Sequence, residues 1–74
     1  MIRCPRNFAY NLRLLRLRAG ITQVALAARV GCAGSAVSAY ESGHKTPGLG
    51  IAVNLARALN TPLDRLCGER LPPC

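Results

Sequence analysis

The sequence ITQVALAARVGCAGSAVSAYESG at residues 21–43 decides how this chain folds, because it contains the end signals of two successive helices. Thr22 is a good N-cap for the earlier helix of this pair, and Gly31 ends that helix. The inner face of this helix carries three apolar residues at helical spacing: Leu26, Ala27 and Val30. The later helix of the pair occupies about residues 33–41 and is closed by Gly43. The sequence therefore predicts two short helices separated by a turn of about three residues at Gly31.

The segment before this pair predicts a helix from about Asn7, a good N-cap, to Ala19, with Gly20 as its stop. Its apolar residues form two stripes on nearly opposite sides, with three arginines between them: Arg13, Arg16 and Arg18. The first stripe can face a core and contains Phe8, Leu12, Leu15 and Ala19. The second stripe contains Tyr10, Leu14 and Leu17. This second stripe is either an interaction surface or a set of scattered exposed side chains.

Two further helices are predicted after the loop GHKTPG at residues 43–48. A fourth helix covers about residues 49–59, with apolar residues at core spacing: Leu49, Ala52, Val53, Ala56 and Leu59. A short fifth helix begins in NTPLDRL at residues 60–66, with Thr61 as N-cap and Pro62 at its first position. No stretch alternates long enough to predict a strand. The chain is therefore expected to be all-α.

A chain of 74 residues, half of them apolar, is sufficient for one small domain. We place this domain at residues 8–67, between a basic N-terminal arm at residues 1–7 and a C-terminal tail at residues 68–74. Neither a secretory signal nor an apolar run long enough to span a bilayer is present, so we expect a cytoplasmic protein.

The acidic and basic residues point to binding rather than catalysis. Ten Lys and Arg against three Asp and Glu give a formal net charge of +7, which attracts polyanions. The few acidic residues and the single His44 are widely spaced, so we predict no catalytic residues and no enzyme activity. The four cysteines contain no C-x-x-C pair, so no metal site is expected. Cys32 is predicted to be a small core residue, and Cys74 to be exposed and oxidisable.

Taken together, LRLLRLRAGITQVALAARVG, AVSAYESG and LARALNTPLDRL resemble the Cro/C1-repressor (Xre-type) helix-turn-helix family over about residues 8–66. Each element is weak alone, but their joint order and spacing are specific. The resemblance implies a five-helix, lambda-repressor-like DNA-binding domain with a central helix-turn-helix. Residues 22–30 would cross the DNA backbone, and residues 33–41 would enter the major groove.

The resemblance also assigns roles to individual residues. Thr22 and Gln23 begin the helix that crosses the backbone, and the family glutamine contacts a phosphate or a base edge. Arg16 and Glu41 match a partly buried ion pair, which we assign to structure. The resemblance places four residues against base edges: Gly34, Ser35, Ser38 and Ala39. Ala33, also assigned to the DNA-binding surface, occupies the position where a helix-capping Ser or Thr is common. Because only two of these carry hydroxyls and none is Arg, Asn or Gln, we expect shallow direct readout.

Phosphate contacts are expected to supply most of the affinity. The candidates for this role are Arg13 in the first helix and the loop residues Ser42, His44 and Lys45, although a solvated surface turn is the alternative for the loop. Arg3 and Arg6 belong to the predicted basic arm. Three other arginines are expected to be solvated charges on the far side: Arg57, Arg65 and Arg70.

We therefore predict a small transcriptional regulator that binds double-stranded DNA with some sequence preference, without a cofactor or a small-molecule substrate. The sequence does not choose between three kinds of regulator: a phage-type repressor, a restriction-modification controller and an antitoxin-like autoregulator. A homodimer is expected, and the resemblance places its contact near three leucines: Leu63, Leu66 and Leu71. The alternative is a protein-protein interaction module that uses Tyr10, Leu14 and Leu17 and binds DNA only weakly. Membrane attachment is less favoured because the basic and apolar faces of the first helix interleave.

Overall fold

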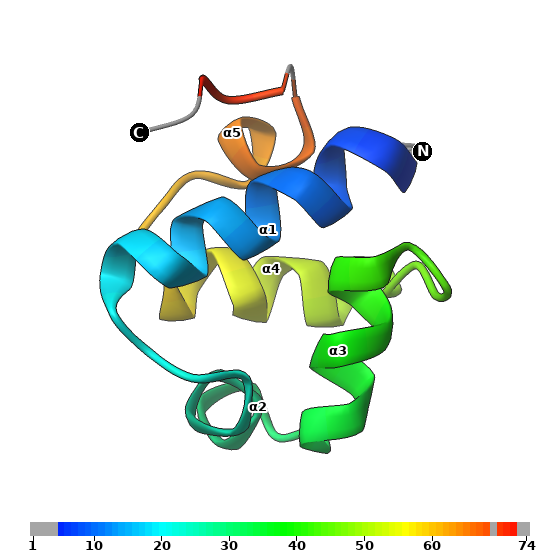
Figure 1. Cartoon of the computed structure of the whole chain (residues 1–74), viewed down its shortest axis with the longest axis vertical. Helices are drawn as coiled ribbons and strands as arrows, with labels where there is room; N and C mark the ends of the chain where they lie inside the picture. Colours follow the sequence, from blue (N-terminus) through cyan, green and yellow to red (C-terminus); the bar gives the residue numbers. More distant parts are fainter. Residues whose placement is uncertain (1–4, 69, 73–74) are drawn as a thin grey trace.

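The computed structural model describes residues 5–68 and 70–72. Within these ranges the chain forms five helices and no strand, as predicted (Figure 1). The helices are α1 (Pro5–Ala19), α2 (Gln23–Val30), α3 (Gly34–Ser42), α4 (Leu49–Ala58) and α5 (Leu63–Cys67). No helix in the described ranges is long and apolar enough to cross a membrane.

The ends of α2 and α3 lie where the sequence predicts them. The Thr22 side chain accepts a hydrogen bond from the Ala25 backbone N–H at 3.0 Å, which caps α2. Gly31 ends α2, and Gly43 ends α3 with φ at 82°, a left-handed conformation that favours glycine. Ala33 precedes α3 without a side-chain cap. The two helices are therefore joined by a tight turn and form a helix-turn-helix.

Two other helix starts differ from the prediction. α1 begins at Pro5 rather than at Asn7, so the helix takes in the last residues of the predicted arm. α5 begins at Leu63, and its N-cap is Pro62 rather than Thr61. The Pro62 carbonyl accepts the first backbone hydrogen bonds of α5, so Thr61 lies one residue too early to cap it. The Thr61 N–H instead donates to the Ala56 carbonyl at 2.9 Å and closes the end of α4.

A single hydrophobic core joins all five helices. Its buried members include Phe8, Leu12, Leu26, Val37, Ala52, Leu55, Ala56 and Leu66. Cys32 and Leu15 are half-buried and pack against this cluster, in agreement with the sequence analysis. Ala19, which was predicted on the core stripe, is exposed because it is the last residue of α1.

The core face of α4 was predicted only in part. Leu49 is 61% exposed, although the sequence predicts it in the core, and Leu55 is fully buried, although the spacing argument omits it. Leu49 is the first residue of α4, and helical side chains lean toward the N-terminus of their helix. Its side chain therefore points beyond the end of the helix into solvent.

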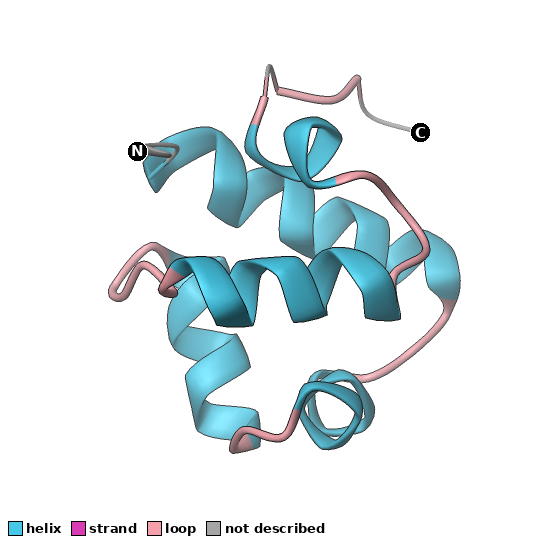
Figure 2. Ribbon diagram, turned by 180° about the vertical axis from the view of Figure 1, so that it is seen from behind, coloured by secondary structure: helices cyan, strands magenta, loops and turns pink. Residues whose placement is uncertain are grey.

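The helices pack in two sets that share α3. α1 packs against α3 and α5, and α2 packs against α3 and α4. Seen from behind, α4 crosses the molecule between α5 and α2 (Figure 2). This arrangement holds α3 between α1 and α2, with part of its surface directed outward (Figure 1).

The segment after α5, which belongs to the predicted C-terminal tail, packs back along α1. The Asn11 side-chain oxygen accepts from the Leu71 N–H at 2.8 Å, and Arg18 donates to the Pro72 carbonyl at 2.9 Å. The guanidinium carbon of Arg70 lies 4.3 Å from the centroid of the Tyr10 ring, so this exposed arginine makes a cation-π contact rather than being only solvated. This tail segment, residues 70–72, therefore crosses the second apolar stripe.

Candidate nucleic-acid interface

The start of α3 packs tightly against α2. A Cβ atom at Gly34 would lie 3.2 Å from Cγ2 of Val24. Real Cβ contacts are rarely so close, so a small residue at this position lets the two helices approach. The family resemblance places Gly34 at a base-facing position, and the packing against Val24 is a separate reason for a small residue there.

The predicted base-facing residues lie along α3 and just before it. Ala33, Ser35 and Ser38 are exposed, whereas Gly34 and Ala39 are half-buried. The two serines are the exposed hydrogen-bonding side chains of this set. Among these residues, the exposed side chains are therefore small and only weakly polar.

An ion pair ties the end of α3 to α1. Arg16 Nε donates to Glu41 Oε2 at 2.5 Å, and Arg16 Nη2 donates to Glu41 Oε1 at 3.1 Å. The two side chains are only 11% and 5% exposed. Arg16 Nη1 also donates to the Ile21 carbonyl at 2.9 Å. The predicted structural ion pair is therefore present, bidentate and nearly buried.

Gln23 joins this ion pair, which the sequence analysis did not predict. Its Nε2 donates to Glu41 Oε1 at 3.1 Å. The residues lie 18 positions apart in the sequence, at the start of α2 and near the end of α3. No local pattern signals such a pairing, because it depends on how α2 and α3 pack.

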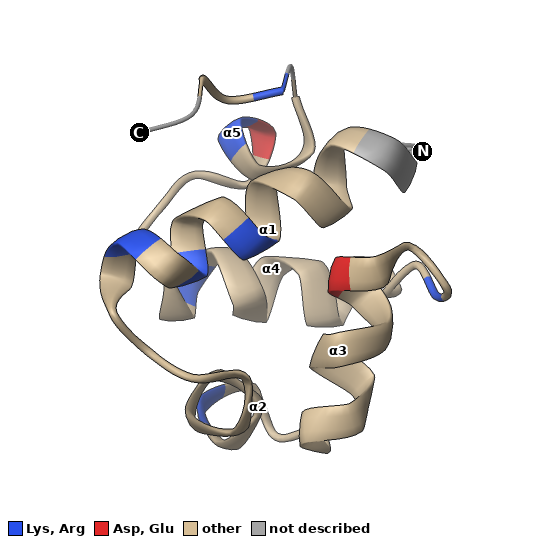
Figure 3. Cartoon of the chain, viewed as in Figure 1, with Lys and Arg blue, Asp and Glu red and all other residues tan. Residues whose placement is uncertain are grey.

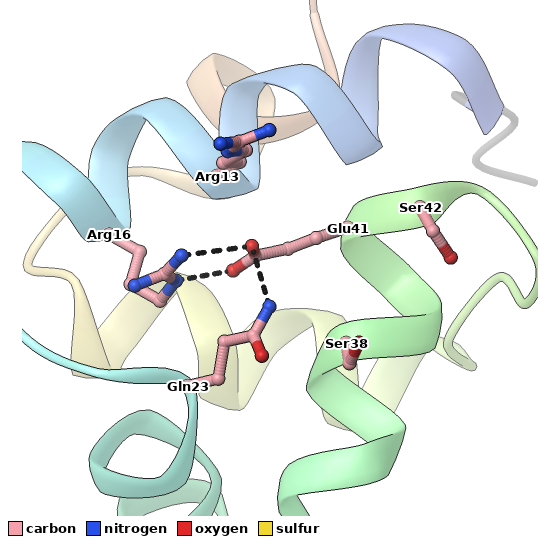
Figure 4. A pocket seen from close by; sticks show the side chains of 6 residues that line it. All are labelled: Arg13, Arg16, Gln23, Ser38, Glu41 and Ser42. Atoms are coloured by element: carbon pink, nitrogen blue, oxygen red, sulfur yellow. Dashed lines mark hydrogen bonds and ion pairs between the residues drawn. The ribbon is translucent and has the colours of Figure 1, made fainter.

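These residues line an open polar hollow of about 210 Å³ between α1, α2 and α3. Its lining consists of Arg13, Arg16, Gln23, Ser38, Glu41 and Ser42. Figure 4 shows Arg16, Gln23 and Glu41 converging from three helices. The structure thus brings together four predicted DNA-binding residues and the two residues of the ion pair.

The other predicted contacts lie around this hollow. Thr22 is exposed, but its hydroxyl oxygen already caps α2. Ser42, His44 and Lys45 are exposed in and beside the loop after α3, with Ser42 Oγ and His44 Nδ1 2.6 Å apart. The backbone N–H groups of His44 and Lys45 donate to the Ala39 carbonyl at 3.0 and 3.3 Å. Phosphate contacts from His44 and Lys45 would therefore come from their side chains.

The distribution of charge alone does not mark one face. Lysine and arginine lie on several helices and in the loop after α3 (Figure 3). The acidic residues in the described ranges are Glu41, which is paired with Arg16, and Asp64 on α5. Arg13 lies on α1 beside the hollow and Arg57 in the last turn of α4, and both are exposed.

Two surfaces were predicted for association: the second apolar stripe of α1, and the leucines in and after α5. Their side chains differ in exposure. On the second stripe of α1, Leu17 is 54% exposed, whereas Tyr10 and Leu14 are half-buried. Leu66, which the resemblance placed near a dimer contact, is fully buried in the core and is not available for one. Leu63 and Leu71 are half-buried.

Cys32 carries a free thiol, and both Cys32 and Cys67 are half-buried. No group of three or more metal-ligating side chains occurs among the residues that the structure describes. Predictions for Arg3, Cys4 and Cys74 concern positions outside the described residues, as does the prediction for the side chain of Arg6.

A family model described as helix-turn-helix matches residues 12–66, which run from within α1 to within α5. The chain therefore belongs to the Cro/C1-type helix-turn-helix family. No curated protein matches it.

Several solved structures are similar to the chain. The P22 c2 repressor in complex with synthetic operator 9T is 29% identical, with a TM-score of 0.77 over 80% of this chain and 89% of that one. The hypothetical transcription factor NHTF from Neisseria is 32% identical, with a TM-score of 0.83 over 96% of this chain and 78% of that one. The restriction-modification controller protein C.AhdI from Aeromonas hydrophila is 34% identical, with a TM-score of 0.77 over 80% and 86%.

Proposed function

We infer that this protein is a DNA-binding transcriptional regulator that docks α3 in the major groove of double-stranded DNA. The observation that carries this conclusion is the outward surface of α3, seated on α2 within a helix-turn-helix domain that matches the family over residues 12–66. The likeness to a repressor bound to operator DNA and to a restriction-modification controller supports it. No comparison supports the alternative of a protein-protein interaction module.

In this proposal, affinity and specificity come from different residues. Arg13 and Lys45 are exposed cations beside α3, and they supply phosphate contacts that hold the protein on any duplex. Ser35, Ser38 and Gln23 supply the polar contacts available for reading bases. Since neither serine makes the bidentate pairs that discriminate best, the two serines add little specificity, and the shape of the DNA contributes to recognition as well.

We further propose that the protein acts as a homodimer in the cytoplasm and regulates transcription without catalytic activity. A two-fold dimer would place two α3 helices about one turn of DNA apart, which requires an operator with repeated half-sites. Leu17 is the most exposed member of the second stripe, so the stripe formed by Tyr10, Leu14 and Leu17 is the candidate dimer contact. The tail segment contacts Tyr10 through Arg70 and Arg18 through Pro72, so this contact would form beside the tail, with Leu17 as its most exposed apolar side chain.

The phosphate assignment is tested by measuring binding to a random duplex at several salt concentrations. Lys45→Ala and Arg13→Ala should each weaken binding by a similar factor for every DNA sequence and lower the salt slope by about 1. Arg57→Ala is the matched control, since it removes an exposed arginine from α4. If both test variants bind random duplex as tightly as the wild type does, the phosphate assignment is wrong.

A further inference from the structure

The hydrogen bond between Gln23 and Glu41 fixes the orientation of the Gln23 amide. A carboxylate only accepts hydrogen bonds, so the amide nitrogen of Gln23 must face Glu41 and its oxygen must face away. Figure 4 shows this arrangement, with the nitrogen directed at Glu41 and the oxygen on the opposite side. Flipping the amide would bring its oxygen against a negative charge.

Glu41 is itself held in place from a second side. Both of its oxygens accept from Arg16, whose remaining nitrogen donates to the Ile21 carbonyl. Its side chain is 5% exposed, so its carboxylate has little freedom to follow a moving partner. The orientation of Gln23 is therefore set by a network anchored in α1 and in the segment between α1 and α2.

The outward edge of Gln23 then presents an oxygen acceptor beside the amide N–H that is not bonded to Glu41. This donor-acceptor edge is complementary to the major-groove edge of adenine, which offers the N6 amino group and the N7 acceptor. A phosphate matches it poorly because phosphate oxygens only accept. Ser38, which is exposed on α3, lines the same hollow, so Gln23 lies beside the surface that enters the groove.

We propose that Glu41 is a positioning residue for sequence recognition: it holds Gln23 so that its amide edge pairs with an adenine in the operator. This inference rests on the proposed DNA-binding function and deepens it. The Arg16–Glu41 pair then has a role in recognition as well as in stability. Gln23 becomes a specificity-determining residue in an interface whose other side chains are small.

The test compares sequence preference, because a purely structural role changes affinity for all duplexes alike. Duplexes are selected from a random pool by the wild type, by Gln23→Ala and by the paired variant Arg16→Met with Glu41→Met. The paired variant removes both charges together, so no buried charge is stranded, yet it releases the Gln23 amide. Circular dichroism first establishes that each variant is folded. If the paired variant does not fold, Glu41→Asp is used in its place. The shorter Asp keeps the charge opposite Arg16 but withdraws from Gln23.

The wild type should prefer adenine by about tenfold at one position of each half-site. Gln23→Ala and the paired variant should both lose this preference at that position, and Arg57→Ala should keep it. Retention of the preference by the paired variant would overturn the positioning role of Glu41. A uniform loss of affinity in Gln23→Ala would make Gln23 a phosphate contact and overturn adenine recognition. Binding by the wild type without any adenine preference overturns the inference alone, whereas no binding to duplex DNA overturns the proposed function.

Discussion

Replacing Arg16 with alanine should strongly destabilise the fold. The substitution removes the guanidinium that donates to both oxygens of Glu41 and leaves a carboxylate that is 5% exposed. Gln23 still donates to this carboxylate, but an amide does not neutralise its charge. Breaking one side of a buried ion pair costs about 3–5 kcal/mol.

This cost is large for so small a domain. Domains are stable by only about 5–15 kcal/mol. For a domain of this size, each kcal/mol shifts the melting temperature by about 4–8 °C, so a loss of about 3 kcal/mol lowers Tm by roughly 12–24 °C. Thermal and urea unfolding followed by circular dichroism measure both quantities.

Two comparisons isolate the reason for the loss. Arg13→Ala removes an exposed arginine from the same helix and should change stability by less than about 0.5 kcal/mol. The paired variant Arg16→Met with Glu41→Met should recover most of the stability that Arg16→Ala loses, because no charge remains buried alone. If Arg16→Ala is as stable as Arg13→Ala, the ion pair does not hold α3 to α1 and the reasoning is refuted.

Three further changes have expected outcomes. Asn11→Leu should cost about 2 kcal/mol in urea unfolding, since it removes the donor to the Leu66 carbonyl and the acceptor of the tail segment; unchanged stability would mean that this buried network is dispensable. Gly43→Ala should cost about 1–2 kcal/mol in thermal unfolding because alanine is strained at a φ of 82°, and no change in Tm would contradict that. Leu14→Glu with Leu17→Glu should abolish self-association in sedimentation while the monomer stays folded; a persistent dimer would exclude this stripe as the contact.

Helix boundaries were largely predictable because their signals are local. Thr22, Gly31 and Gly43 act through hydrogen bonds and backbone angles within one turn of their own position. Pro62 was predicted at the first helical position of α5 but lies at its N-cap. The start of α5 was misjudged by one residue because proline is compatible with both positions.

The contacts that define the candidate site were less predictable because they join distant segments. The Arg16–Glu41 pair was expected from the family resemblance, not from spacing, and the bond from Gln23 was missed. Asn11 was likewise missed, since a polar residue in a helix gives no sign that the tail segment will return to it. Burial of Leu55 rather than Leu49 depends on where α4 starts relative to its neighbours.

Base-facing positions remain a prediction from the family register. The structure explains why such a small recognition surface can exist, because Gly34 serves the packing of α3 on α2. In the proposal above, the most specific polar contact comes from the start of α2 rather than from α3, because Gln23 is bonded to Glu41 there.

The central claim is that α3 docks on duplex DNA, and titration of a duplex into the ¹⁵N-labelled protein tests it most directly by NMR. We expect the largest amide shift changes in Gly34–Ser42 and at Gln23, and we expect them to diminish as salt is added. Shift changes confined to the second stripe of α1 and the tail segment, or no changes at all, would contradict it.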